Sequence, residues 1–360
     1  KSKKIKTFCI GVENKNYDES KYAKDVANHL STEHEELILS EKSMTEEVPS
    51  IIGNLNEPFG DSSFIPTYFV SKLAKKKVKV VLTGDAGDEI FGGYNRYTQL
   101  RNLSKIHALP RSFKKIINSS LSNMSEKNIN RINLFAKLFP FFKNQFYLND
   151  KIKKLFDRID PDLNFSDFIF NFMTNKVDLN LLKNSNTFSK KKIFKIFNQK
   201  FSDKKLGKLT LEEKIMYIDT TAYLPNDILF KVDRASMANS VETRAPFLDK
   251  DLYDFSFSLS IDQKINKSKG KVILRDLLKT KIPNNLIDRP KGGFSIPIGN
   301  WINKPLLDWS ENLLSKKNVE KSGLLNFENV SKIWLNHKKG IDNSSLIWSI
   351  LVFQQWLLNR

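Results

Sequence analysis

The stretch VVLTGDAGDEIFGGY, residues 80–94, joins an apolar strand directly to a loop of small residues. The loop carries three carboxylates, Asp85, Asp88 and Glu89, within five positions. Its glycines allow the backbone to approach a ligand closely. In a parallel α/β sheet, ligands bind beyond the carboxyl ends of the strands, which is where such a loop lies. The stretch therefore predicts a ligand site at the end of a buried strand.

Two interpretations of the acidic loop stay open at this point. Like charges at such close spacing repel unless a cation lies among them, and carboxylate oxygens around a nucleotide-associated Mg²⁺ explain them economically. The other interpretation is a turn whose acids cap the following helix, with Asp88 at the N-cap. The full run of strand, loop, acids and paired glycines favours the ligand site.

The elements before this stretch alternate in type. Strands are expected over residues 5–12, 34–39 and 78–82, and helices from Ser20 to Leu30 and over 44–55 and 65–76. Alternating strands and helices predict a parallel sheet with helices on its faces. The fold class is therefore α/β, a parallel-sheet core with a large, mainly helical portion. We expect three parts: an α/β nucleotide-binding core over 1–100, a helical segment over 101–210, and a mainly helical part over 211–360 that completes the site.

Residues 101–210 differ from the rest in composition. They contain 15 of the 27 Phe residues, with 23 Lys and Arg against 8 Asp and Glu. Phe interleaved with Lys is compatible with a platform for single-stranded nucleic acid. It is more typical of a helical core with a solvated outer face, so we expect buried Phe and outward Lys side chains here.

Composition excludes several classes of protein. The chain has a net charge of +19, which attracts polyanions or follows from an AT-rich codon bias toward Lys, Asn and Ile. No apolar run reaches the ~18 residues of a membrane span. One cysteine, Cys9, excludes an internal disulfide framework, and no pair among the four histidines has the spacing of a zinc-protease motif. We expect a cytoplasmic protein without a nucleic-acid or membrane partner; homodimer formation stays open.

A second segment, residues 227–249, concentrates charge. Asp227, Lys231 and Arg234 are spaced i, i+4 and i+7, which is one face of an α-helix. Glu242 and Arg244 share a face if their segment is extended. These five are candidates for contacts with substrate or phosphate, although a solvated face of charge pairs has the same spacing.

A third segment, residues 269–301, contains Lys291 between Pro290 and two glycines. This pattern is typical of a mobile loop that brings an ammonium group over an anion. An isolated Lys-Gly-Gly is usually a surface turn. Five of the ten arginines, however, lie in or beside the three segments, and arginine in a lysine-rich chain suggests a need for its planar fork.

Together these segments resemble the synthetase domain of glutamine-hydrolysing asparagine synthetases. The matching motifs are Thr7-Phe8-Cys9-Ile10-Gly11, Glu57-Pro58-Phe59-x-Asp61, the 80–94 stretch, Asp233-Arg234-x-Ser236-Met237, Glu242-x-Arg244-x-Pro246-Phe247-Leu248-Asp249 and Lys291-Gly292-Gly293-Phe294. The resemblance covers nearly the whole chain and is weakest over 101–210. Asp85 stands where many members carry Glu. The resulting Gly-Asp-x-Gly-Asp-Glu form resembles a branch found among polysaccharide-biosynthesis genes, so the acceptor acid need not be free aspartate.

The resemblance implies an ATP-pyrophosphatase-type fold and an ATP site. The family adenylates a carboxylate with ATP and releases pyrophosphate, and ammonia then attacks the acyl-adenylate to give an amide. Ile10 would offer its backbone to adenine, and Thr83 and Gly84 would contact the nucleotide. Asp85 would support adenylate formation, and Asp88 would bind Mg²⁺. The implied partners are ATP, aspartate or an analogue, and ammonia from a glutaminase domain.

The resemblance also assigns a role to Lys291, which would stabilise charge on the α-phosphate during adenylation. The family's pyrophosphate loop, Ser-Gly-Gly-x-Asp-Ser, is absent, and Gly60-Asp61-Ser62-Ser63 follows Pro58-Phe59 rather than a strand, so it is not accepted as a substitute. We therefore expect the carboxyl-terminal part of a longer enzyme, inactive alone. A β-lactam synthetase-like enzyme and a basic nucleic-acid-binding protein remain the alternatives.

Overall fold

The structure, a computed structural model, is mixed α/β and mostly helical. It describes residues 4–13, 18–108, 110–112, 115, 164–174, 178–183, 195, 197–199, 201–202, 204–266, 269–288 and 296–360. The chain divides into two compact units, one of Lys1–Asn95, Leu179–Ser185 and Ile215–Arg360, and the other of Arg96–Asp178 and Asn186–Lys214. No helix among the described residues is long and apolar enough to cross a membrane.

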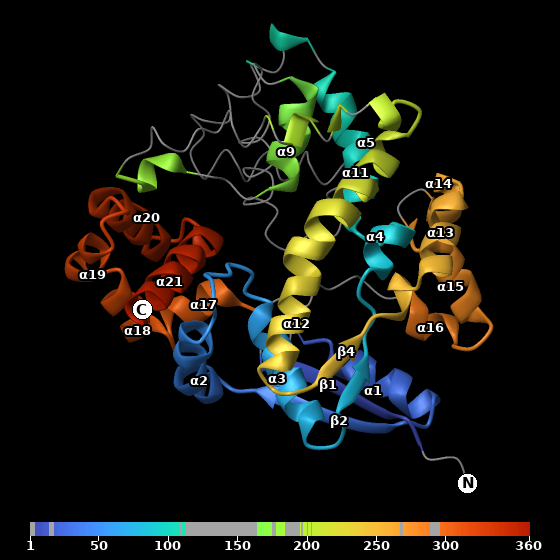
Figure 1. Cartoon of the computed structure of the whole chain (residues 1–360), viewed down its shortest axis with the longest axis horizontal. Helices are drawn as coiled ribbons and strands as arrows, with labels where there is room; N and C mark the ends of the chain where they lie inside the picture. The colour runs from blue at the N-terminus through green and yellow to red at the C-terminus, as the bar shows by residue number, and fades with distance from the viewer. Residues whose placement is uncertain are drawn as a thin grey trace. The chain divides into compact units, whose positions relative to one another are not determined.

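The amino-terminal part of the first unit alternates strands and helices as expected. Its elements are β1 (Lys6–Val12), α1 (Ser20–His29), β2 (Glu33–Leu39), α2 (Glu41–Gly53), α3 (Phe64–Lys75), β3 (Val80–Leu82) and α4 (Gly87–Phe91). β1 and β2 form a parallel ladder in which Ile10 is opposite Leu37 (Figure 1). All three predicted strands are present, and the parallel pairing of β1 with β2 requires a crossover connection, which contains α1.

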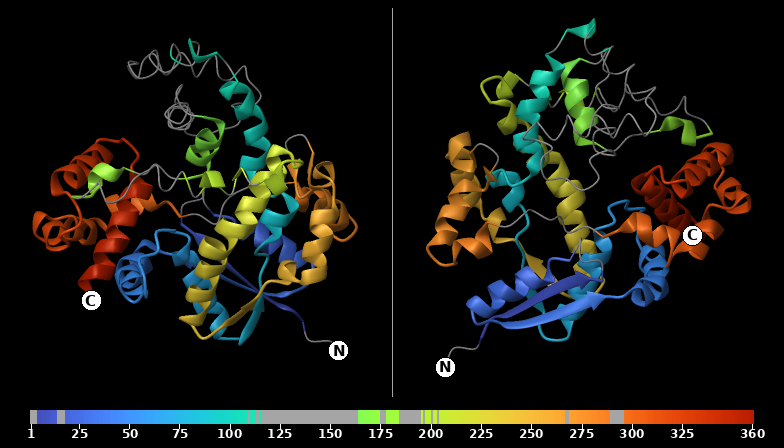
Figure 2. Two further views of the ribbon diagram at one scale, coloured as in Figure 1. Left: turned by 45° about the horizontal axis from the view of Figure 1, so that its top comes forward. Right: turned by 180° about the vertical axis from the view of Figure 1, so that it is seen from behind.

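The rest of this unit is mainly helical, as predicted for residues 211–360. Its elements are η2 (Leu179–Leu181), the π-helix η5 (Asp219–Ile228), α12 (Leu229–Met237), β4 (Glu242–Arg244), η6 (Pro246–Leu248), α13 (Lys250–Ser258), α14 (Ile261–Lys264), β5 (Ile265–Asn266), β6 (Lys269–Gly270), α15 (Val272–Lys279), α16 (Asn284–Ile287), α17 (Ile298–Asn303), α18 (Leu307–Leu313), α19 (Lys316–Lys321), α20 (Phe327–Lys338) and α21 (Ser344–Leu358). α12 lies alongside α3 (Figures 1 and 2).

The sheet differs from the single parallel sheet expected. β3 pairs in parallel with β4, and among the described residues this ladder is separate from the β1–β2 ladder. A third ladder, β5 with β6, is antiparallel. The partner of β3 lies about 160 positions downstream, and no local pattern in β3 encodes so distant a pairing. In place of one parallel sheet, the described residues form two small parallel ladders and one antiparallel ladder.

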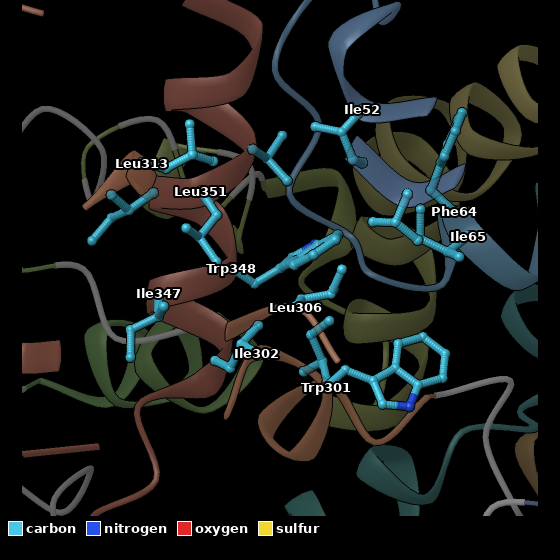
Figure 3. Close-up of a cluster of buried hydrophobic side chains, with 14 of the residues drawn as sticks. Ile52, Phe64, Ile65, Trp301, Ile302, Leu306, Leu313, Ile347, Trp348 and Leu351 are labelled. Atoms are coloured by element: carbon cyan, nitrogen blue, oxygen red, sulfur yellow. The ribbon is translucent and has the colours of Figure 1, made fainter. Parts of the chain in front are cut away.

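A large apolar core joins α2, α3 and α17 to α21. Trp348 of α21 lies among Ile52, Leu306 and Leu351, and all four are at least nine-tenths buried (Figure 3). At about 25 cal/mol per Å² of buried apolar surface, an aromatic side chain of this size is a main contributor to stability. This core fixes α3, whose first turn begins at the candidate site.

The second unit contains most of α5 (Asn95–His107), with α9 (Phe165–Met173), η4 (Lys204–Leu206) and the start of α11 (Leu211–Ile218). Phe168 and Phe201 are buried, while Lys204 and Lys208 are exposed. These few positions agree with the predicted helical core. Most of the Phe and Lys residues on which that prediction rests lie outside the described residues.

Candidate functional site

The acidic loop forms a tight turn between β3 and α4. The backbone N–H of Thr83 donates to the carbonyl of Arg244 (2.9 Å), so the β3–β4 ladder continues to the start of the turn. Ala86 ends the turn with φ +70°, a left-handed conformation that costs a non-glycine residue about 1–2 kcal/mol. Ala86 is also fully buried. The strained turn persists because packing on both sides holds it.

A second apolar cluster anchors the helix that follows the turn. Ile90 and Phe91 of α4 are completely buried against α13 and α15. The Phe91 ring packs edge-on against Phe247, with ring centroids 5.8 Å apart. Phe247 belongs to η6 and is partly buried against this cluster. Asp85 and Asp88 lie beyond the carboxyl end of β3, as predicted. The expectation of a buried strand was wrong, because Val80 is 40% and Leu82 74% exposed in this edge ladder.

A buried lysine lies beside the turn. The Lys231 ammonium donates to Asp61 Oδ2 (2.9 Å) and to Ser63 Oγ (2.8 Å), and Ser63 donates to both carboxylate oxygens of Asp61. Burial alone raises the pKa of Asp61, but Lys231 and Ser63 outweigh it and hold that pKa below its ordinary value. Asp61 is therefore ionised and shares a hydrogen-bonded triad with the lysine.

The charge of Lys231 also lowers the pKa of Asp85, but at Asp85 the effect of burial is larger. Burial raises the pKa of Asp85, and the neighbouring negative charge of Asp88 raises it further. The Thr83 hydroxyl and the Lys231 charge oppose this rise without cancelling it. A carboxyl group whose pKa is raised by burial beside a fixed cation is typical of catalytic sites.

Asp88 faces a different cation. The Lys271 ammonium lies 3.2 Å from Asp88 Oδ1. A Cβ atom on Gly93 would lie 1.9 Å from that same oxygen and 2.3 Å from Lys271 Cε. Lys271 itself has φ +56°. Only glycine at position 93 leaves room for this ion pair, and the backbone of Lys271 is strained to make it.

The third acid of the loop is inward-facing. Glu89 is almost completely buried and accepts a hydrogen bond from the Tyr94 hydroxyl (2.6 Å). Burial raises the pKa of Glu89, and Asp88 and Asp219 raise it further against the Tyr94 bond. Burial and the Glu89 charge likewise raise the pKa of Tyr94, which stays protonated as the donor. The buried hydrogen bond between Tyr94 and Glu89 thus stabilises the helix that follows the turn.

The structure separates the charges of the second segment. Lys231 is buried, whereas Arg234 is exposed and its guanidinium lies 5.2 Å from the Phe230 ring. Asp227 belongs to the π-helix η5, whose i to i+5 bonds change the phase before α12 begins. The predicted helical spacing therefore holds for Lys231 and Arg234 within α12, whereas Asp227 lies near the end of a π-helix.

The remaining predicted residues are placed as follows. Glu242 and Arg244 are extended in β4 and form an ion pair (Nε to Oε1, 2.7 Å), which confirms that they share a face. Both are more than half exposed. Ile10 is buried in β1, in the other parallel ladder. Lys291 lies outside the described residues.

Three residues at this site were not predicted, namely Asp61, Ser63 and Lys271. Asp61 and Ser63 lie just before α3, with Ser63 at its N-cap position, and the signal for them was the motif that ends in Asp61. Lys271 lies in the third segment, and a signal for it was the pair of glycines in the acidic stretch, which permits a close approach. In each case the partner is far along the chain: 170 positions separate Asp61 from Lys231.

The donors present fit a phosphate-bound Mg²⁺ rather than an ion held by protein alone. The described residues contain no group of three or more His, Cys, Asp or Glu side chains placed to hold a metal. Mg²⁺ in nucleotide sites usually takes one or two carboxylates, with phosphates and waters completing its shell. Asp88, with Asp85 close enough to feel its charge, can supply such carboxylates.

Comparison with known proteins decides the family. The asparagine synthase family matches residues 1–358 of the chain. The chain belongs to the asparagine synthase family.

Individual family members agree along nearly all of this chain. Asparagine synthetase [glutamine-hydrolyzing] 1 of Bacillus subtilis is 28% identical over 359 residues, covering 98% of this chain and 52% of its own length. A putative asparagine synthetase of Mycobacterium tuberculosis is 26% identical over 357 residues, covering 97% and 50%. A putative asparagine synthetase of Methanocaldococcus jannaschii is 40% identical over 125 residues, covering 35% and 24%. The chain thus spans about half the length of the first two.

Proposed function

We propose that the protein is an ATP-dependent, amide-forming ligase of the asparagine synthase family. The observation that carries the proposal is the acidic turn after β3, where Asp85 lies beside a buried, hydrogen-bonded Lys231. Family membership supports the reaction class. The fold is proposed to be of the ATP-pyrophosphatase type, and the protein is proposed to act in the cytoplasm.

The first step is formation of an acyl-adenylate. A carboxylate oxygen of the substrate attacks the α-phosphorus of ATP, the bond to the bridging oxygen breaks, and pyrophosphate leaves. Bound Mg²⁺ supplies charge neutralisation on the phosphates, and Asp88 would hold it. Asp85 orients the reacting groups, and Lys291 stabilises charge on the α-phosphate. Ile10, Thr83 and Gly84 are proposed to bind adenine and the nucleotide.

The second step forms the amide. Ammonia attacks the acyl carbon, AMP leaves with the electron pair of the broken C–O bond, and the amide nitrogen loses a proton. The proposed acid is the side chain of aspartate or an analogue, and the ammonia is proposed to come from glutamine. Arg234, Glu242, Arg244 and Asp227 remain candidates for contacts with substrate or phosphate.

Lys231 has a narrower role in this proposal than a direct substrate ligand. Its ammonium already donates to two side chains and is almost completely buried. A buried charge fixed in this way acts on its neighbours without reorganising during the reaction. Lys231 therefore supplies a fixed positive charge near Asp85, which favours the ionised form of that carboxyl group.

The products test this proposal. The intact protein that contains these 360 residues is incubated with Mg²⁺, ATP, aspartate and either glutamine or ammonium, and products are identified by mass spectrometry. The proposal requires AMP and pyrophosphate in step with a new amide. ADP and phosphate as the products, or AMP release that is independent of any carboxylic acid, would refute it.

A further inference from the structure

The end of α21 is tied to the loop that leads into the candidate site. The Trp356 indole donates to the carbonyl oxygen of Asn56 (3.0 Å). Arg360 Nη2 donates to the same oxygen (3.0 Å) and to the carbonyl of Leu55 (3.4 Å). The Arg360 guanidinium also lies 5.5 Å from the Trp356 ring. Two side chains thus hold successive carbonyls just beyond the end of α2.

These contacts satisfy two carbonyls of the loop that follows α2, because Leu55 and Asn56 lie beyond its last residue, Gly53. A loop carbonyl has no partner from a regular helix or strand, so a side-chain donor is needed to satisfy it. Residues 54–63 between α2 and α3 belong to neither helix, so such bonds are what fix the path of the backbone there.

The same loop is held at its far end. The Phe59 ring packs on Phe230 (5.0 Å between centroids) and edge-on against Phe64 (6.2 Å). Gly60 lies so close to α21 that a Cβ atom there would be 3.0 Å from Ser349 Oγ. The loop therefore follows the surface of α21 from Asn56 to Gly60.

The next residue is Asp61, the partner of Lys231. Its carboxylate accepts from Ser63 and from the Lys231 ammonium over 2.7–2.9 Å. A hydrogen bond weakens steeply when its geometry changes, so a small shift of the loop would loosen this triad. Asn56 precedes Asp61 by five residues, with Pro58 and the packed Phe59 between them to transmit the position.

We propose that Trp356 and Arg360 are positioning residues that hold the 54–61 loop against α21, so that Asp61 keeps Lys231 in place beside the acidic turn. The contacts with the loop do not depend on the proposed function. The kinetic consequence does rest on it.

Amide hydrogen exchange tests the contact itself. In Trp356→Phe, the amides of Ser63, Phe64 and Ile65 should exchange about three- to tenfold faster, because one hydrogen bond that fixes the loop is lost. The matched control is Trp309→Phe, which removes an indole bond of the same kind to Gln355 Oε1 (2.6 Å) but none to the loop. Equal exchange in both variants would overturn the proposal, whatever reaction the protein catalyses.

Kinetics then test positioning. In the intact protein, Trp356→Phe should lower kcat about three- to tenfold with KM for ATP unchanged, whereas Trp309→Phe should leave both near the parent values. Arg360→Lys, which keeps a donor, should lose less than Arg360→Ala. In an Asp61→Asn background, Trp356→Phe should have no further effect on kcat. Additive losses of kcat in the double variant would show that Trp356 does not act through Asp61. Faster amide exchange at the loop with an unchanged kcat would overturn the positioning role.

Discussion

Asp61 and Lys231 form the ion pair on which the site depends. Their side chains are 24% and 10% exposed, so removing one partner leaves a charge that water reaches poorly. We expect Lys231→Met to lower the free energy of unfolding by about 3 kcal/mol, while Asp61→Asn/Lys231→Met recovers part of that loss. Urea unfolding at neutral pH measures both. A double variant no more stable than Lys231→Met would contradict a mutually compensated pair.

The ionisation of Asp61 gives stability a defined pH dependence. Its pKa in the folded protein lies below the ordinary value of 3.8, although burial works against this, because Lys231 and Ser63 stabilise the charged form. The unfolded chain therefore binds a proton first as the pH falls, and the contribution of Asp61, complete above about pH 5, is lost through and below pH 4. Thermal unfolding from pH 6 downward should show this loss, and Asp61→Asn should remove part of it. An identical acid profile in Asp61→Asn would contradict the assignment.

Lys291 gives a prediction that concerns catalysis alone. If its ammonium meets the α-phosphate chiefly in the transition state, Lys291→Ala should lower kcat about 10²- to 10³-fold and change KM for ATP far less. Lys291→Arg should restore little, because a planar guanidinium does not replace a compact ammonium group. Steady-state kinetics of the intact protein, with thermal unfolding of the same variants, check this. Near-normal kcat in Lys291→Ala would remove it from the mechanism.

Local sequence revealed part of the residue-scale picture and missed another part. The positions of Asp85 and Asp88 after β3 were predictable, because three closely spaced acids directly after an apolar strand repel one another unless a cation or a cap compensates them. Lys271 was not, since its contact with Asp88 depends on a strained backbone and on the space that Gly93 leaves. Lys231 was predicted as a contact with substrate or phosphate, with a solvated charge face as the alternative, whereas its ammonium is paired with Asp61, 170 positions away in sequence.

At the scale of elements, two glycines of the acidic stretch should behave oppositely. A Cβ on Gly93 would collide with Asp88 and Lys271, whereas a Cβ on Gly84 would meet nothing within 4 Å. Gly93→Ala should therefore lower Tm by breaking the ion pair. Gly84→Ala should leave Tm unchanged and weaken ATP binding, if the open space beside it receives the nucleotide.

Thermal unfolding and ATP titration of both variants provide the check. Unchanged ATP affinity in Gly84→Ala would argue against nucleotide contact at this position. An unchanged Tm in Gly93→Ala would show that the ion pair shifts without cost.

Elements with strong local patterns were predictable, and pairings between them were not. The strands β1 and β3 follow from short apolar runs, whereas β2 is apolar only in its last three residues, 37–39. The parallel partner of β3, however, is β4, a three-residue strand too short to have a pattern of its own. The π-helix η5 also escaped prediction, because its side-chain spacing over ten residues resembles an α-helix with a Pro inside.

At the scale of the whole molecule, the account rests on the first compact unit. The candidate site draws on the loop before α3, the turn after β3, α12 and the segment before α15, and all of these belong to that unit. The apolar cluster around Ile90 and Phe91 anchors the helix that follows the turn, in which Ala86 has a strained conformation. Such rigidity suits a site whose charges must be placed before substrate arrives. Family membership follows from motifs spread along the chain, which is why sequence was sufficient to identify it.

The most direct test of adenylation by the acidic turn is ATP–pyrophosphate exchange. In the intact protein, exchange should require both Mg²⁺ and a carboxylic acid. Asp85→Asn should lower it by about 10²-fold or more without lowering Tm at neutral pH, because burial raises the pKa of Asp85 and makes its ionised form costly to the fold. Asp254→Asn, at an acid 62% exposed on α13, is the control and should exchange normally. Exchange in Asp85→Asn equal to that of Asp254→Asn would contradict the central claim.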